Sequence, residues 1–353
     1  MKKFILIITT IIFFSIPVSA DGIEDRYIQK LENIVTEYEI DFDKLKENPF
    51  ETLYECVKKT IKAPIDKSLN IVYKTAGVLL ITSFINLFSL GNNDVSKTIN
   101  TVAVAVIFYT VFDSVLYMIH NVSDMLFDVK NFMTVFLPVF GGISFAAGEV
   151  ATSALYTGFF LVSVISVANF CVNYILPSVN LYLAVGITSQ VSSVINLKPL
   201  CEFYTKTVKT AMTATVSVLC FVLSLQTVIA QGKDGLVLKA GKMIVTSTVP
   251  IIGSALESAV GSVYASMGVL KGFCGIAGVA VIISIFMPHI VSLAWYWICC
   301  QLMIVFGAII ENKLAQELLA YFKDVIEILI SMCVLFLILL VFSVTVMIKA
   351  TGV

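Results

Sequence analysis

The residues in this chain that could do chemistry lie in a run of small and weakly polar side chains from Pro250 to Gly268. If this run is a helix, residues four apart stack on one face. Two adjacent ladders result: Ser254, Ser258, Ser262 and Ser266, and beside them Gly253, Glu257, Gly261 and Ala265. In a bilayer such a face either lets another helix approach closely or lines a wet passage. We therefore expect an assembly of helices built around this stripe.

Several ionisable side chains are candidates for a site inside the membrane. An ionisable group in mid-bilayer costs ~2.5–3.5 kcal/mol on insertion scales, so it marks a site by default. Glu257 and Asp113 lie in apolar runs. The alternatives are a membrane edge or wet crevice for Glu257 and the outer interface for Asp113. Glu149 lies near a short turn, and His289 follows Pro288 at a break between apolar runs, where an interfacial histidine competes with a proton relay.

A second small-residue run resembles the first. Leu137-Pro-Val-Phe-Gly141 precedes Gly, Ser and Ala residues, as Val249-Pro-Ile-Ile-Gly253 precedes the stripe. Two interpretations are open: chance similarity, or an internal repeat of residues 99–195 and 211–310 with re-entrant or broken helices that face each other. The candidate packing or pore-lining residues are Pro138, Gly141, Gly142, Glu149, Pro250, Gly253, Ser254, Glu257, Ser258, Gly261, Ser262 and Ser266.

The sequence offers little for enzymatic chemistry. It contains no nucleotide-binding glycine loop, no Ser/His/Asp grouping and no His/Cys metal cluster. Only His120 and His289 are available as histidine ligands, and the eight cysteines lie mostly in apolar runs. The net charge of −1 provides no basic surface for nucleic acid. We predict no enzyme activity, no catalytic residue, no metal and no cofactor.

The composition indicates a membrane protein. The chain has 353 residues, of which 58% are hydrophobic and 13% charged, and its mean hydropathy is +0.96. Soluble domains are ~25% charged. A water-soluble fold cannot hide so many apolar side chains, so we predict an all-α polytopic bundle with eight to ten apolar segments.

The amino end is typical of a secretory signal. Met1-Lys-Lys is basic, Phe4 to Ile16 is apolar, and Val18-Ser-Ala20 is a small-residue cleavage site. We expect residues 1–20 to be cleaved, an uncleaved anchor being the alternative. Either outcome leaves residues 21–68 outside the membrane as a charged helical segment, whose apolar stripe rests on the membrane or on a partner.

Residues 69–353 form the predicted transmembrane domain. Pro177-Ser178 is read as a tight hairpin between two spans and Pro288-His289 as a pivot. The apolar spans of roughly 20 residues are Ile71–Leu90, Ile99–Ile119, Phe132–Ala147, Ala154–Leu176, Val179–Ile195, Ala211–Ala230, Met243–Gly268, Gly272–Met287, Ile290–Ile310 and Val325–Ile348.

The charges of the predicted loops do not assign the topology. Residues 121–131 are acidic and favour the outside, whereas residues 231–242 are basic and favour the inside. Residues 196–209 are also basic and favour the inside. Only one predicted span separates the two basic loops, so both cannot be satisfied.

The chain resembles the stage III sporulation protein AE family of endospore-forming bacteria. The resemblance rests on Phe136–Ala154, on Leu223–Gly241 running into Val249–Gly253, and on the order of signal, charged segment and spans. It covers essentially the whole chain, although the extramembrane segment is somewhat short for the family. That difference concerns only the partner contacts of the segment.

This resemblance implies a membrane subunit of the channel or secretion-like complex that joins mother cell and forespore. It implies a place in the mother-cell membrane around the engulfed forespore. The implied partners are the other membrane proteins of the sporulation operon and a forespore-side protein across the intermembrane space. The complex sustains forespore development and late gene expression there. The family supplies no catalytic residues.

Two other functions fit the residues alone. One is a stand-alone secondary transporter with an ion- or proton-coupled site at Glu257 and Asp113. The other is a scaffold that recruits partners and carries nothing. Uptake by the reconstituted chain alone would distinguish the transporter.

Overall fold

The computed structural model describes most residues between 28 and 58, and then residues 65–88, 93–191, 197–248 and 253–349. Among these residues the secondary structure is helical, with turns but no strand. The predicted all-α class is therefore confirmed. The predicted signal peptide, residues 1–20, and Pro250 lie outside the described residues.

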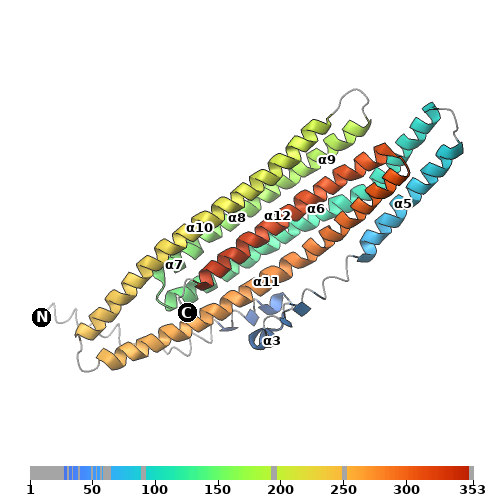
Figure 1. Ribbon diagram of the computed structural model, residues 1–353. Coiled ribbons are helices and arrows are strands. Elements are labelled where there is room, and N and C mark those ends of the chain that lie inside the picture. The colour runs from blue at the N-terminus through green and yellow to red at the C-terminus, as the bar shows by residue number, and fades with distance from the viewer. Residues whose placement is uncertain are drawn as a thin grey trace.

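Long helices lie side by side in one elongated bundle (Figure 1). Residues 150–191 form one side of it together with α10, and α5 and α11 form the other, with α6 and α12 between them. The single helices are α5 (Ile65–Phe88), α6 (Asn93–Ala146), α10 (Lys198–Thr248), α11 (Gly253–Ile309) and α12 (Lys313–Lys349). Residues 150–191 are one rod of α7 (Val150–Ala154), η1 (Leu155–Phe160), α8 (Leu161–Phe170), η2 (Cys171–Ile175) and α9 (Leu176–Val191).

Within the described residues, five helices are long and apolar enough to cross a membrane. They are Thr101–Ala146, Val150–Gly186, Lys198–Leu236, Ser266–Ile309 and Lys313–Ile348. This supports the multi-pass membrane class. The predicted number of eight to ten segments is not confirmed, because several spans predicted as separate lie in one helix. Residues 99–119 and 132–147, for example, fall mainly within α6.

The hairpin predicted at Pro177-Ser178 is wrong, since the chain stays helical there. A π-helical turn, η2, ends two residues before Pro177. Such a turn shifts the backbone hydrogen-bond register, which can accommodate the missing N–H and the ring of proline. The Ser178 hydroxyl donates to the Ile175 carbonyl at 2.7 Å. Local adjustments of this kind keep a proline inside a membrane helix.

The pivot predicted at Pro288-His289 is also wrong. Helix α11 runs through both residues without a break. The His289 ring nitrogen Nδ1 lies 2.9 Å from the Ile285 carbonyl oxygen, one turn earlier. Buried neighbours such as Phe286 hold this part of α11 within the bundle.

Charged stretches predicted as loops are parts of helices. Residues 121–131 lie within α6, residues 231–242 lie within α10, and residues 198–209 begin α10. The span predicted over residues 243–268 is instead divided, since α10 ends at Thr248 and α11 begins at Gly253. Apolar periodicity alone did not distinguish a charged helical surface from a loop. The internal repeat stays a prediction.

Two glycines allow the helices to approach one another closely. A Cβ atom at Gly141 would overlap the Cγ2 methyl group of Thr157, so α6 lies directly against the rod that follows it. A Cβ atom at Gly278 of α11 would overlap the Phe136 ring of α6. Small residues at such crossings allow membrane helices to pack through backbone contact.

Part of the charged N-terminal segment packs on the flank that α6 and α11 form. The Tyr38 ring meets the Phe132 ring of α6 edge-on, with 5.7 Å between ring centres. Phe42, the first residue of α3 (Phe42–Glu47), meets Phe273 of α11 in the same way at 5.4 Å. Burial in this contact raises the pKa of Tyr38 to about 12.

Candidate functional site

Polar groups that link different helices form two clusters at different heights along the bundle. The α7 cluster surrounds the first turn of α7 and comprises Glu149, Ala151, Thr152, Asp234 and Lys271. The α12 cluster surrounds the middle of α12 and comprises Tyr182, Lys209, Trp297, Lys323, Asp324 and Glu327. Each cluster joins residues that are far apart in the sequence.

Asp234 of α10 supplies the N-terminal cap of α7. Glu149, at the N-cap position, makes no capping hydrogen bond with its side chain. Instead the Asp234 carboxylate accepts the backbone N–H groups of Ala151 at 2.7 Å and Thr152 at 2.9 Å, and also the Thr152 hydroxyl at 2.7 Å. The first N–H groups of a helix lack internal partners and carry partial positive charge. A carboxylate that is only 4% exposed is therefore well satisfied here.

Lys271 of α11 forms an ion pair with Glu149 in the turn between α6 and α7. The Lys271 side chain is fully buried, and its Nζ atom also lies 5.6 Å from the centre of the Phe140 ring. A buried ammonium group requires a charged or polar partner, and removing that partner is strongly destabilising. The ion pair therefore attaches α11 to the α6–α7 turn.

The turn itself is shaped by a glycine and by hydroxyl groups. Gly148 has a φ of 83°, a left-handed conformation that favours glycine. The Ser153 hydroxyl donates to the Gly141 carbonyl at 2.7 Å, across the close contact of α6 with α7. One turn further, the hydroxyls of Tyr156 and Thr227 are 3.1 Å apart and connect η1 to α10.

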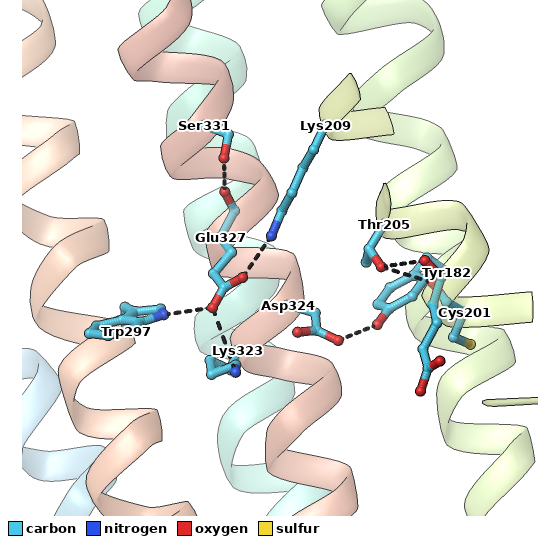
Figure 2. A network of polar contacts seen from close by, with 10 residues as sticks. Tyr182, Cys201, Thr205, Lys209, Trp297, Lys323, Asp324, Glu327 and Ser331 are labelled. Carbon is cyan, nitrogen blue, oxygen red and sulfur yellow. Dashed lines mark hydrogen bonds and ion pairs between the residues drawn. The ribbon is translucent and has the colours of Figure 1, made fainter. Parts of the chain in front are cut away.

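Glu327 is the centre of the α12 cluster, as Figure 2 shows. Its carboxylate accepts a hydrogen bond from Lys209 Nζ of α10 at 2.6 Å and one from the indole N–H of Trp297 of α11 at 3.1 Å. Lys323, one turn earlier on α12, lies 3.6 Å from the same carboxylate. One side chain thus joins three helices, at a site that is only partly buried.

Asp324 extends the α12 cluster to the fourth helix (Figure 2). It accepts the Tyr182 hydroxyl of α9 at 3.0 Å. The Tyr182 ring stacks on Tyr204 of α10 with 5.2 Å between ring centres. Within each cluster, the charged side chains pair with other members of the cluster. Such pairs hold neighbouring helices together, whereas a site for a solute would leave charged groups open to bind it.

The structure places the residues of the first small-residue run in different surroundings. Gly141 is buried at the contact with Thr157, whereas Gly142 is half-buried. Pro138 is inside α6 with an exposed ring. Glu149 belongs to the α7 cluster and pairs with Lys271.

The second run is described mainly by its backbone. It is helical from Gly253, and Ser266 is exposed. The side chains of Ser254, Glu257, Ser258, Gly261 and Ser262 lie outside the described residues.

The structure does not bring Glu257 and Asp113 together. Asp113 is exposed on α6, about 36 residues and therefore about 54 Å of helix from Glu149. Helix α11 lies beside Glu149 at Lys271. Glu257 lies about 14 residues before Lys271 on α11, and it is further along the bundle from Asp113 than Glu149 is. The two candidate carboxylates are therefore near opposite ends of the bundle.

Four residues of the clusters were not predicted from the sequence: Asp234, Lys271, Lys209 and Glu327. Each of these residues lies at the edge of a long uncharged stretch, and this position could have identified it as a candidate. It was not used, because the stretches were not predicted to be continuous helices. Over the part of the chain that the structure describes, no group of three or more His, Cys, Asp or Glu could hold a metal ion.

A family model described as stage III sporulation protein AE matches residues 29–351, which include both clusters. No match is found among curated proteins or among solved structures.

Proposed function

The chain belongs to the stage III sporulation protein AE family, and on that premise we propose that it is a membrane subunit of the channel or secretion-like complex that links mother cell and forespore. In this role it serves forespore development after engulfment. It resides in the mother-cell membrane around the forespore, with its N-terminal segment outside the cytoplasm. Its partners are the other membrane proteins of the sporulation operon and a forespore-side protein.

The observation that carries the proposal is the family match over almost the whole chain. The architecture is compatible with it, since five apolar helices of spanning length form one bundle. The two clusters clamp these helices through charged contacts such as Lys271–Glu149 and Lys209–Glu327. A rigid, clamped bundle suits a subunit that is held among partners. We further propose that the chain is not an enzyme and needs no cofactor.

The small-residue ladder of α11 is the surface that we propose for packing against partner helices. Replacing Ser258 or Gly261 by leucine would fill the space that a partner helix needs. Either variant should block sporulation after engulfment while the protein remains in the membrane. Val269→Leu is the matched control, because Val269 is 75% exposed on the same helix. Normal spore yield from both ladder variants would contradict the proposed role.

The stand-alone transporter is less favoured by the geometry. A coupled site at Glu257 and Asp113 would require residues from the two ends of the bundle to meet. Uptake by the purified chain in vesicles, lost in Asp113→Asn, would nevertheless establish it. A scaffold would be indicated if Glu257→Gln were inert while the ladder variants lost co-purification of partners.

A further inference from the structure

One side of the bundle is free of charge over a long stretch. Residues 150–191 contain no Asp, Glu, Lys or Arg, and neither do residues 210–232 of α10. These segments lie together on one side of the molecule (Figure 1). Large apolar side chains project from them into the surroundings, including Phe159, Val162, Phe170, Val218, Phe221 and Leu225.

The two clusters bound this apolar surface. On α10 it begins after Lys209 of the α12 cluster and ends before Asp234 of the α7 cluster, about 25 residues or about 38 Å further along. On α12 the charge-free stretch from Glu327 to Lys349 is about 33 Å long. The hydrocarbon core of a bilayer is ~30 Å thick, or ~40–45 Å with its headgroups. Both intervals match this thickness.

The exposed face of α6, which lies between the two sides of the bundle, differs in chemistry. Exposed polar residues three, four or seven positions apart form one stripe along α6, which we term the α6 stripe: Asp113, His120, Asp124, Asp128 and Asn131. Asp128 lies about 32 Å and Asn131 about 27 Å along the chain from Glu149, so both are inside the interval that the clusters bound. Ionisable residues at membrane depth almost always face protein or water rather than lipid.

Protein covers part of the neighbouring flank that α6 and α11 form. Tyr38 and Phe42 of the N-terminal segment contact Phe132 of α6 and Phe273 of α11. That segment carries exposed charged residues such as Glu47, which hydrocarbon would not accommodate. The stripe and the neighbouring segment therefore distinguish this face of α6 from the apolar surface of residues 150–191 and α10.

We propose that the bundle is two-sided in the membrane. The apolar surface of residues 150–191 and α10 contacts lipid acyl chains, with the α7 cluster at one membrane interface and the α12 cluster at the other. The α6 stripe faces away from lipid. This placement depends on membrane insertion alone and is independent of the sporulation role.

The placement also locates the small-residue ladder. Helix α11 meets the interface at Lys271, so Glu257, about 14 residues earlier, stands about 21 Å beyond it. The ladder residues before Ser266 then lie outside the bilayer, so this placement contradicts the intramembrane position that the sequence predicted for Glu257. A partner helix would meet the ladder there.

Fluorescence quenching in vesicles tests the two sides directly. The full chain would carry an NBD fluorophore on cysteine at Val218→Cys or Asn131→Cys, in phosphatidylcholine and phosphatidylglycerol vesicles. Both positions are exposed, and they lie about 24 and about 27 Å from the α7 cluster along their helices. The wild-type chain treated with the same reagent is the blank for its native cysteines.

Nitroxide placed in the middle of the acyl chains should quench the fluorophore at 218 several-fold more strongly than the one at 131. Iodide in the water should quench position 131 more, or neither position if protein covers the stripe. Equal lipid quenching at both positions would overturn the two-sided arrangement. A third variant, Lys233→Cys, should respond to headgroup nitroxide, and stronger quenching by mid-chain nitroxide would overturn the assigned interface.

Discussion

The Asp234 carboxylate of α10 accepts the backbone N–H of Thr152 at 2.9 Å, so one membrane helix caps the start of another. Helix α7 has no side-chain cap of its own at Glu149. The contact therefore stabilises α7 and also fixes the height at which α10 stands against the α6–α7 turn. Local helix formation and tertiary alignment depend on the same carboxylate.

Replacing Asp234 with alanine should lower the thermal midpoint of unfolding in detergent micelles. Loss of an N-cap costs about 0.5–2 kcal/mol, and the Thr152 hydroxyl would lose its acceptor as well. Lys233→Ala is the control, since that neighbouring side chain is exposed. Equal midpoints for the two variants would show that the cap does not stabilise the fold.

Lys271→Met should be among the most destabilising single changes in the bundle. It leaves Glu149 without its partner at a side-chain exposure of 12%. Removing one partner of a buried pair costs about 3–5 kcal/mol, whereas replacing both partners is often nearly neutral. The double variant Lys271→Met with Glu149→Gln should therefore recover most of the lost stability in the same unfolding measurement. A double variant as unstable as Lys271→Met would contradict the pairing.

The Lys209–Glu327 pair should contribute less to the free energy of unfolding than the Lys271–Glu149 pair. Its side chains are 34% and 29% exposed, so water screens the interaction. We expect Lys209→Met to cost about 1 kcal/mol or less, and Lys323 remains near Glu327 as a second cation. Unfolding midpoints should therefore fall further for Lys271→Met than for Lys209→Met, and the reverse order would be evidence against the assigned burial.

Gly141→Ala should destabilise the contact of α6 with η1, because the added methyl group would overlap the Thr157 Cγ2 atom. Overpacking of this kind costs about 1–3 kcal/mol. Thr157→Ser removes that methyl group but keeps the hydroxyl that donates to the Ser153 carbonyl. The double variant Gly141→Ala with Thr157→Ser should restore the yield of folded protein. Gly158→Ala is the matched control, because a Cβ atom at Gly158 would meet nothing within 4 Å. If Thr157→Ser does not rescue Gly141→Ala, the destabilisation does not come from the overlap with the Thr157 methyl group.

Composition and periodicity were sufficient to predict an all-α membrane bundle, because both are properties of the chain alone. They were not sufficient to predict where helices end. Pro177 and Pro288 looked like breaks, but η2 before Pro177 and tertiary packing around Pro288 keep the helices continuous. A proline signals a break only when nothing nearby replaces the backbone hydrogen bond that it removes.

The site was predicted only in part, for a similar reason. Gly141 and Glu149 were identified from small-residue spacing and from charge in an apolar run. Asp234 and Lys271 were missed because their partners are set by the relative heights of α10, α11 and the α6–α7 turn. Relative height is a tertiary property, and no short stretch of sequence contains it.

Helix α6 runs for 54 residues without a hinge, even at Pro138. At 1.5 Å per residue the helix is about 81 Å long, which is much longer than a bilayer is thick. A displacement of its Asn93 end that leaves the helix straight would reach Ala146 as a tilt, slide or rotation of the whole of α6. The Glu149–Lys271 pair lies just beyond the Ala146 end, so it would resist such a movement at the far end of the helix.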